Sequence, residues 1–206
     1  MATHPGYPAE LRAGPVLLRP PRRRDAVEWS RVRTSNREWL QPWEPTSPST
    51  WQARSSTASW AALLSTLRGA ARAGTSIPMV VTYGGRLVGQ VNASNVIRGV
   101  LRSASVGYWV DAAVAGRGIT PTAVALMIDH LLGPVGLHRV EINIRPENAN
   151  SLRVAEKLGL RREGVHERFL DIDGGWRDHI TFAITSEEVT AGPVLARLPV
   201  LPPLPG

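Results

Sequence analysis

Cysteine is absent from this chain of 206 residues, and its absence excludes disulfide bonds, thiol catalysis and cysteine-based metal sites. Histidine, another common metal ligand, occurs five times, at His4, His130, His138, His166 and His179. These positions are scattered without the spacing of metal ligands. We therefore expect ordinary structural or surface histidines and no metal ion.

Long hydrophobic runs are also missing. No apolar stretch approaches the length that a helix needs to cross a bilayer. The first residues, MATHPGYPAELRAG, lack the order of basic and then apolar residues that marks a secretory signal. We therefore expect a soluble, cytoplasmic protein with no membrane partner.

Acidic residues are fewer than basic ones. The chain has 17 Asp and Glu residues against 24 Lys and Arg residues, which gives a formal net charge of +7. This excess favours anionic partners such as a phosphorylated cofactor or RNA. The run Arg22-Arg23-Arg24 is typical of a solvated surface, and the sequence contains no zinc finger, RRM signature or basic heptad region. No sequence-specific nucleic-acid partner is expected.

Composition and hydrophobic periodicity predict one α/β domain. Hydrophobic residues make up 43% of the chain and charged residues 20%, which suits a sizeable core. Strands are predicted at residues 16–19, 78–83, 86–91, 106–110, 139–144, 169–172 and 179–185, and helices after Asp25 as N-cap, at 50–73, at 124–132 and at 151–158. This order predicts a mixed, mostly antiparallel central sheet flanked by helices over residues 15–190. Residues 1–14 are expected to be flexible, and the proline-rich residues 191–206 to form a disordered tail.

The stretch at residues 106–132, VGYWVDAAVAGRGITPTAVALMIDHLL, has the pattern of a strand, a glycine loop and a helix. Gly116 and Gly118 allow the backbone to approach a ligand closely, and the free N–H groups at a helix N-terminus favour an anion such as phosphate. The Rossmann and P-loop patterns do not match at this spacing. A simple turn is the alternative interpretation of the two glycines.

The glycine segment resembles the coenzyme A loop of the GNAT N-acetyltransferases, Gln/Arg-x-x-Gly-x-Gly/Ala. Ala115 stands where that pattern has Gln or Arg, and Thr120 stands where it has Gly or Ala. Three further segments resemble the bacterial ribosomal-protein-alanine N-acetyltransferases: NREWLQPWEP at 36–45, NANSLRVAEKLG at 148–159 and DGGWRDHITFAI at 173–184.

This resemblance implies an acetyl-CoA-dependent enzyme in which an amine attacks the thioester directly. It implies that Tyr108, Trp109 and Val110 lie along the pantetheine, with the Val110 N–H as a donor to the thioester oxygen. It further implies a pyrophosphate cradle formed by Ala115, Gly116, Arg117, Gly118, Ile119 and Thr120. Asn148 falls at the coenzyme-contacting asparagine of the family; a turn residue before a helix is the alternative.

Many GNAT enzymes place a tyrosine seven residues after that asparagine, where it assists the departing thiolate. Here the position is Ala155, so Ser151 is the substitute that the ribosomal-protein enzymes suggest, although its hydroxyl could equally cap a helix. Glu141 is the candidate base because it is predicted on the strand beside the coenzyme cleft; a salt-bridged strand residue is the alternative.

The expected acceptor is the N-terminal α-amine of a protein, with a ribosomal protein as the candidate. Trp39 and Trp43 could form flat apolar walls for a peptide or could merely plug the domain edge, and Glu44 could attract the cationic amine. A small amine, such as an aminoglycoside or polyamine, remains an alternative, as does a non-enzymatic CoA-binding regulatory module. The sequence leaves open whether the protein is a monomer or a homodimer.

Overall fold

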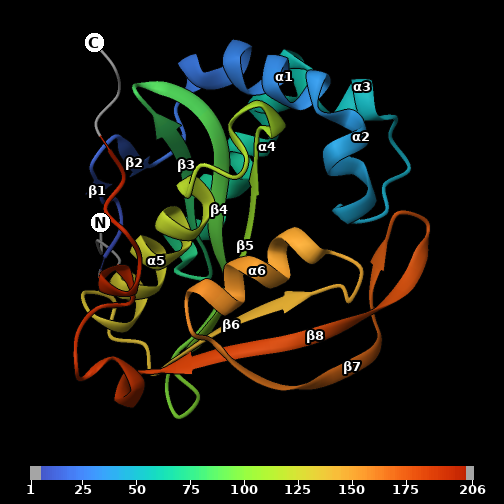
Figure 1. Cartoon of the computed structure of the whole chain (residues 1–206). Coiled ribbons are helices and arrows are strands. Elements are labelled where there is room, and N and C mark those ends of the chain that lie inside the picture. Colours follow the sequence, from blue (N-terminus) through green and yellow to red (C-terminus); the bar gives the residue numbers. More distant parts are fainter. Residues whose placement is uncertain (1–5, 203–206) are drawn as a thin grey trace.

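An eight-stranded mixed sheet forms the centre of the computed structural model, which describes residues 6–202 (Figure 1). The strand order is β1-β2-β3-β4-β5-β6-β8-β7, and every neighbouring pair is antiparallel except β5 and β6, which are parallel. The strands are β1 (Leu11–Ala13), β2 (Val16–Arg19), β3 (Ile77–Tyr83), β4 (Arg86–Ile97), β5 (Ser103–Val110), β6 (Arg139–Ile144), β7 (Arg161–Ile172) and β8 (Gly175–Thr185).

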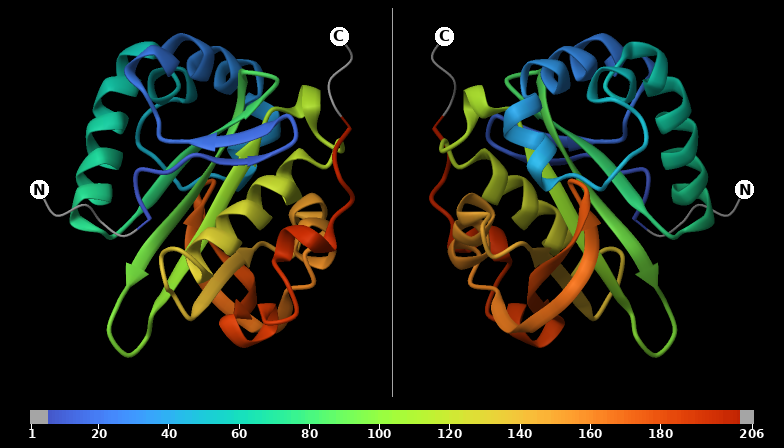
Figure 2. Two further views of the ribbon diagram at one scale, coloured as in Figure 1. Left: turned by 90° about the vertical axis from the view of Figure 1, so that its left-hand side faces the viewer. Right: turned by 90° about the vertical axis from the view of Figure 1, so that its right-hand side faces the viewer.

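Helices cover both faces of this sheet (Figures 1 and 2). They are α1 (Ala26–Ser35), α2 (Arg37–Leu40), α3 (Trp51–Arg54), α4 (Thr57–Ala73), α5 (Ile119–Leu132) and α6 (Ala149–Lys157). On one face, Trp29 of α1 and Trp60 of α4 pack with Val80 of β3. On the other face, the nearly all-apolar helix α5 lies in the main core with α6, as expected for a helix that is hydrophobic all round. The sheet is therefore the middle of three layers.

The predicted single α/β domain and most of its elements are confirmed. The strand at Arg139–Ile144 has the predicted bounds, and both hairpins form with longer strands than expected. The helix predicted at 50–73 is interrupted at Ser55 and Ser56, where the Ser56 hydroxyl caps α4 by accepting from Ser59 N. No helix between residues 6 and 202 has the length and apolar character needed to cross a membrane.

Asp25 occupies the N-cap position of α1, as expected, but its side chain makes no capping hydrogen bond to this helix. Its carboxylate accepts hydrogen bonds from the Arg19 guanidinium at 2.8 and 2.7 Å and from the Arg22 N–H at 2.7 Å. Because Asp25 itself has helical backbone angles inside a short 3-10 turn, its side chain cannot reach the first turn of α1. The residue instead anchors the end of β2 to the start of the helix.

The two terminal segments also differ from the expectation of flexibility. Residues 11–13 form β1, and a 3-10 helix, η5 (Val194–Arg197), packs on α5 with Val194 fully buried. The Asp129 carboxylate of α5 accepts from the N–H groups of Val194 at 2.7 Å and Leu195 at 3.0 Å. The predicted disorder is therefore wrong for this part of the tail, while residues 1–5 and 203–206 lie outside the described part of the chain.

Candidate active site

The site begins where β5 loses its pairing with β6. Their parallel register covers only residues 103–105 of β5, whereas β4 pairs with β5 as far as Val110. In an antiparallel pair, successive residues alternately bond to the partner strand and point away from it. Asp111 N donates to Val88 O at 2.7 Å, so the main-chain groups of Tyr108 and Val110 point away from β4. Their N–H groups therefore face the β6 side of the strand as potential donors.

The glycine loop follows β5 and leads into α5. Gly116 and Gly118 have φ of +79° and +80°, a region that residues with a Cβ rarely adopt, and a Cβ on Gly116 would meet nothing within 4 Å. Gly118 is the N-cap of α5, and its carbonyl accepts from Thr122 N. The N–H groups of Ile119 and Thr120 precede this first helical hydrogen bond, so they are available to an anion.

The N-terminus of α6 forms the opposite wall. Asn148 is the N-cap of this helix, since its Oδ1 accepts from Ser151 N at 3.1 Å. Ser151 is therefore not the capping residue. The Tyr108 hydroxyl reaches this point from β5 and donates to the Ser151 main-chain oxygen at 3.5 Å. Burial raises the pKa of Tyr108 to about 12, so the phenol stays protonated at neutral pH.

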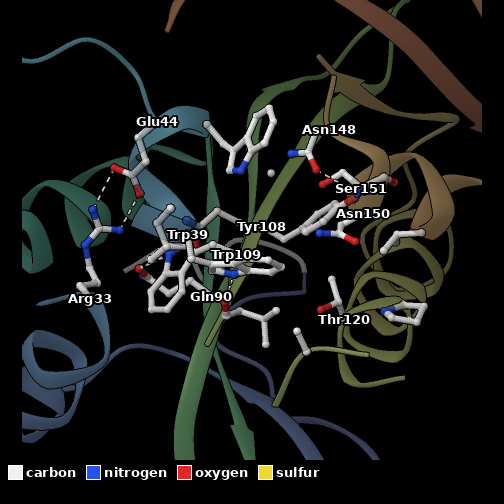
Figure 3. A pocket seen from close by; sticks show the side chains of 18 of the residues that line it. Arg33, Trp39, Glu44, Gln90, Tyr108, Trp109, Thr120, Asn148, Asn150 and Ser151 are labelled. Carbon is white, nitrogen blue, oxygen red and sulfur yellow. Dashed lines mark hydrogen bonds and ion pairs between the residues drawn. The ribbon is translucent and has the colours of Figure 1, made fainter. Parts of the chain in front are cut away.

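A cavity of about 660 Å³ connects these elements. Figure 3 shows Arg33 and Glu44 on one side of it, Asn148, Asn150, Ser151 and Thr120 on the other, and Tyr108 and Trp109 between them. Most of the predicted site residues line it: Trp39, Trp43, Glu44, Tyr108, Trp109, Val110, Ala115, Gly116, Gly118, Thr120, Asn148 and Ser151. Ile119 has its side chain buried in the core, and Arg117 is exposed outside the lining.

The two tryptophans of segment 36–45 form one end of this cavity. Trp39 Nε1 donates to Val110 O at 3.0 Å, which confirms that this carbonyl points away from β4. The Trp43 ring lies beneath the Arg145 guanidinium at 5.2 Å, and Arg145 also donates to Pro42 O at 2.8 Å. Both indoles line the cavity, as the interpretation of an apolar wall requires.

Segments 36–45 and 173–184 meet in space although they are far apart in sequence. The tip of the β7–β8 hairpin bonds to the chain after Trp43, through Asp173 N to Glu44 O at 3.1 Å and Thr46 N to Asp171 O at 3.0 Å. At its other end, the segment is anchored to the turn after β5, where Asn36 bonds the Asp111 carboxylate at 2.9 Å. The acceptor end of the cavity is therefore fixed to both the β5 turn and the hairpin.

Glu44 is not available to attract a cation, contrary to expectation. Its carboxylate receives two hydrogen bonds from Arg33, at 2.6 and 2.9 Å, and lies 3.5 Å from the Arg54 guanidinium. The Arg33 side chain is only 7% exposed and packs over the Trp51 ring at 4.7 Å. This end of the cavity therefore carries two arginines for one carboxylate.

Glu141 lies on β6 but does not line the cavity. Its Oε1 accepts from Arg139 Nε at 2.7 Å, and Arg139 also pairs with Glu163 of β7. This is the salt-bridged strand residue that the sequence left as an alternative. Its placement removes the geometric basis for Glu141 as the base.

Sequence reasoning missed several polar residues that line the cavities. Asn150, Arg153 and Lys157 project from one side of α6 into the large cavity. Their spacing of three and four residues on a helix was the available signal. His179 of β8 lines a smaller cavity of about 180 Å³, which shares Tyr108, Asn148 and Ser151 with the large one.

Comparison with known proteins places these features in a family. Residues 16–161 match the family model described as "Acetyltransferase (GNAT) domain". The chain is 30% identical to the "[Ribosomal protein uS5]-alanine N-acetyltransferase" of Escherichia coli K12, over 82% of this chain and 87% of that protein. It is 40% identical to "Probable N-acetyltransferase YjcK" of Bacillus subtilis, over 50% of this chain and only 57% of that relative.

A solved structure resembles nearly the whole chain. "Mycobacterium smegmatis RimJ in complex with CoA-disulfide" superposes with a TM-score of 0.90 at 43% identity, covering 94% of this chain and 95% of that one.

Proposed function

Because the chain belongs to the GNAT acetyltransferase family and is an acetyl-CoA-dependent N-acetyltransferase, we propose that its acceptor is the N-terminal α-amine of a protein, with a ribosomal protein as the candidate. One observation carries the proposal: a single cavity joins the glycine loop to an apolar wall of two tryptophans. The name of the Escherichia coli relative, a ribosomal-protein-alanine N-acetyltransferase, agrees with this acceptor.

The coenzyme end of the cavity has the donors that a phosphorylated ligand requires. The N–H groups at the start of α5 and the open space at Gly116 suit a pyrophosphate. We assign Arg153 and Lys157 as additional cations for the phosphates, since both line this end of the cavity. The positive net charge of the chain is consistent with such a ligand.

The middle of the cavity has the groups that acyl transfer requires. The Val110 N–H is a donor for the thioester oxygen, where charge develops as the amine attacks. The hydroxyls of Tyr108 and Ser151 lie near the N-terminus of α6, where either could donate a hydrogen bond to the leaving sulfur. The rest of the rate enhancement comes from holding the two reactants together.

The charge at the acceptor end favours a peptide over a polycation. A polyamine or aminoglycoside needs several free carboxylates, but the one carboxylate here is shared by Arg33 and Arg54. A protein N-terminus presents one amine followed by an uncharged backbone, which suits apolar walls and main-chain contacts.

A mass-spectrometric acetylation screen tests the acceptor. It offers a peptide with a free N-terminal alanine, the same peptide with a blocked N-terminus and an internal lysine, spermidine and an aminoglycoside. We expect acetylation of the free α-amine alone. Acetylation of the small amines with the peptides left unmodified would refute the acceptor while leaving the acetyltransferase activity intact.

A further inference from the structure

His179 is the only histidine among residues 6–202 that lines either cavity. It lies on β8 with 4% of its surface exposed. Two residues further along β8, Thr181 pairs with Asn143 of β6 and donates to its side-chain oxygen at 2.7 Å. Because alternate residues of a strand share a face, His179, Thr181 and Asn143 lie on one side of the sheet. Trp43, from the acceptor end, closes the same small cavity.

The hydrogen bonding of His179 fixes which ring nitrogen can accept a proton. Nδ1 lies 3.0 Å from Arg177 O. A carbonyl oxygen only accepts hydrogen bonds, so Nδ1 carries the hydrogen and the lone pair of the neutral ring is on Nε2.

The surroundings keep this imidazole neutral. Burial is the largest cause and lowers the pKa of His179, and the positive charge of Arg145 acts in the same direction. The hydrogen bond to the Arg177 main chain, the second-largest cause, raises the pKa, as do the smaller contributions of Glu147 and Asp178, but the net shift is downward. His166 of β7 is paired with His179 in the sheet, and the Phe169 ring lies 5.9 Å from the His179 ring. A histidine whose pKa is below its usual value is ready to accept a proton at pH 7.

We infer that His179 is the general base of the acetyl transfer. The inference rests on the proposed function, because it requires an amine that enters past Trp43 toward Tyr108 and Ser151. As the nitrogen–carbon bond forms, the proton on the attacking nitrogen becomes strongly acidic and passes to Nε2 of His179. The carbon–sulfur bond then breaks and the electron pair leaves with the sulfur. Solvent protonates the thiolate to give the free thiol, and His179 releases its proton to solvent, which restores the neutral base.

This assignment explains why Glu141 is not needed as the base. Glu141 is held by Arg139 outside both cavities, whereas His179 shares a cavity with the groups assigned to the leaving sulfur. An α-amine has a pKa of about 8, so a neutral imidazole is a base of suitable strength for its proton once attack has begun.

The test compares His179→Gln with His166→Gln. His166 is an exposed histidine on the neighbouring strand and lines neither cavity, so it is a matched control. We expect His179→Gln to lower kcat/KM for an N-terminal alanine peptide about 100-fold at pH 7. Binding of CoA, measured by calorimetry, should stay within about twofold of the wild type. His166→Gln should behave as the wild type.

The pH profile separates a base from a merely structural residue. Below the pKa of His179, log kcat/KM of the wild type should rise with a slope of two, one proton from the amine and one from the imidazole. His179→Gln should keep a slope of one, and His179→Asn should do the same. Equal slopes for the wild type and both variants, or an unchanged rate in the variants, would overturn the inference.

The outcome remains interpretable if the acceptor proposal fails. Should the wild-type enzyme acetylate small amines and leave peptides untouched, the same comparison of slopes with the small amine decides the role of His179. A variant with a lowered melting temperature is compared through its slope over the pH range in which it stays folded, where the slope does not depend on the concentration of active enzyme.

Discussion

At the scale of single residues, the structure places a tyrosine of β5, Tyr108, near Ser151, although the helix lacks the tyrosine that many family members have. The sequence has Ala155 where many family members have a tyrosine on the helix, and Ala155 is fully buried. Tyr108 instead brings a hydroxyl from β5 to the N-terminus of α6, near Ser151. With a pKa of about 12, this phenol cannot protonate a thiolate, whose thiol has a pKa near 8.5. It can still donate a hydrogen bond.

Tyr108→Phe should therefore slow acetyl transfer without abolishing coenzyme binding. A hydrogen bond to a charged group contributes about 1.5–3 kcal/mol, so we expect kcat to fall about 10- to 100-fold. The loss should be independent of pH from 6 to 9, because the phenol does not ionise there. Steady-state kinetics across this range measures the effect.

Tyr83→Phe is the control, since Tyr83 lies on β3 and lines neither cavity. A fall in kcat that grows or vanishes within this pH range would contradict the role of Tyr108 as a neutral donor.

The environment of a residue could not be predicted from the sequence where it depends on partners far away along the chain. The ion pairs of Glu44 with Arg33 and Arg54 span separations of eleven and ten positions, respectively, and no local pattern distinguishes this glutamate from a free carboxylate. His179 was similarly grouped with ordinary structural or surface histidines, because its burial depends on β6 and β7 on either side of it. Contacts between elements far apart in the sequence decide both cases.

At the scale of elements, local patterns predicted well what local forces determine. The strand, glycine loop and helix predicted in residues 106–132 formed in the expected order, with the strand beginning at Ser103 and the helix at Ile119, because strand alternation and the two glycines act within a few residues. The break between α3 and α4 was missed: the predicted apolar stripe lies entirely within α4, and Ser56 starts that helix separately from α3. Asp25 is the N-cap residue of α1 but does not cap it through its side chain, because Arg19, six residues earlier, holds the carboxylate.

The glycine loop allows a test of its two positions against each other. Alanine at Gly116 or Gly118 would adopt a left-handed backbone at a cost of about 1–2 kcal/mol. Gly118→Ala would in addition bring its Cβ to 2.9 Å from Leu201 Cδ2, whereas Gly116→Ala meets open space. We expect both to weaken CoA binding and Gly118→Ala to lose more stability. Calorimetry and urea unfolding measure these quantities.

Combining Gly118→Ala with Leu201→Ala separates the two costs. Measured against Leu201→Ala alone, Gly118→Ala should cost less stability than it does in the wild type, because the contact is gone, but it should still lose CoA affinity. Full CoA affinity in a folded Gly116→Ala variant would show that the loop is only a turn.

At the scale of the whole molecule, the sequence predicted the fold class and the elements around the glycine loop better than the contacts at the tryptophan end of the cavity. The glycine loop lies within one continuous stretch, from β5 to α5, and α6 lies opposite it. The tryptophan end depends on contacts between the segment around residues 36–46 and the tip of the β7–β8 hairpin, together with Arg145. Such contacts follow from tertiary packing, which a single sequence does not reveal.

The C-terminal segment is a second case in which tertiary contacts could not be predicted from the sequence. Its lack of periodicity suggested disorder, but in the structure it contacts both α5 and the end of α6. Asp129 holds its start on α5, and the Arg197 guanidinium donates to Leu158 O at 2.7 Å, just after α6. Leu201 then reaches the start of α5 beside Gly118. The segment is therefore a strap across both helices.

Ending the chain at Gly192 should consequently weaken both the fold and coenzyme binding. Loss of the fully buried Val194 alone removes about 1.5–3 kcal/mol of hydrophobic stabilisation, and the hydrogen bonds of Asp129 and Arg197 are lost with it. We expect a free energy of unfolding lower by about 3 kcal/mol. A chain ending at Pro202 keeps the strap and serves as the control. Because a ligand that binds only the folded state stabilises it, saturating CoA should raise the melting temperature of the control more than that of the shortened chain. An equal rise in both would show that the strap stabilises the core without supporting the coenzyme site.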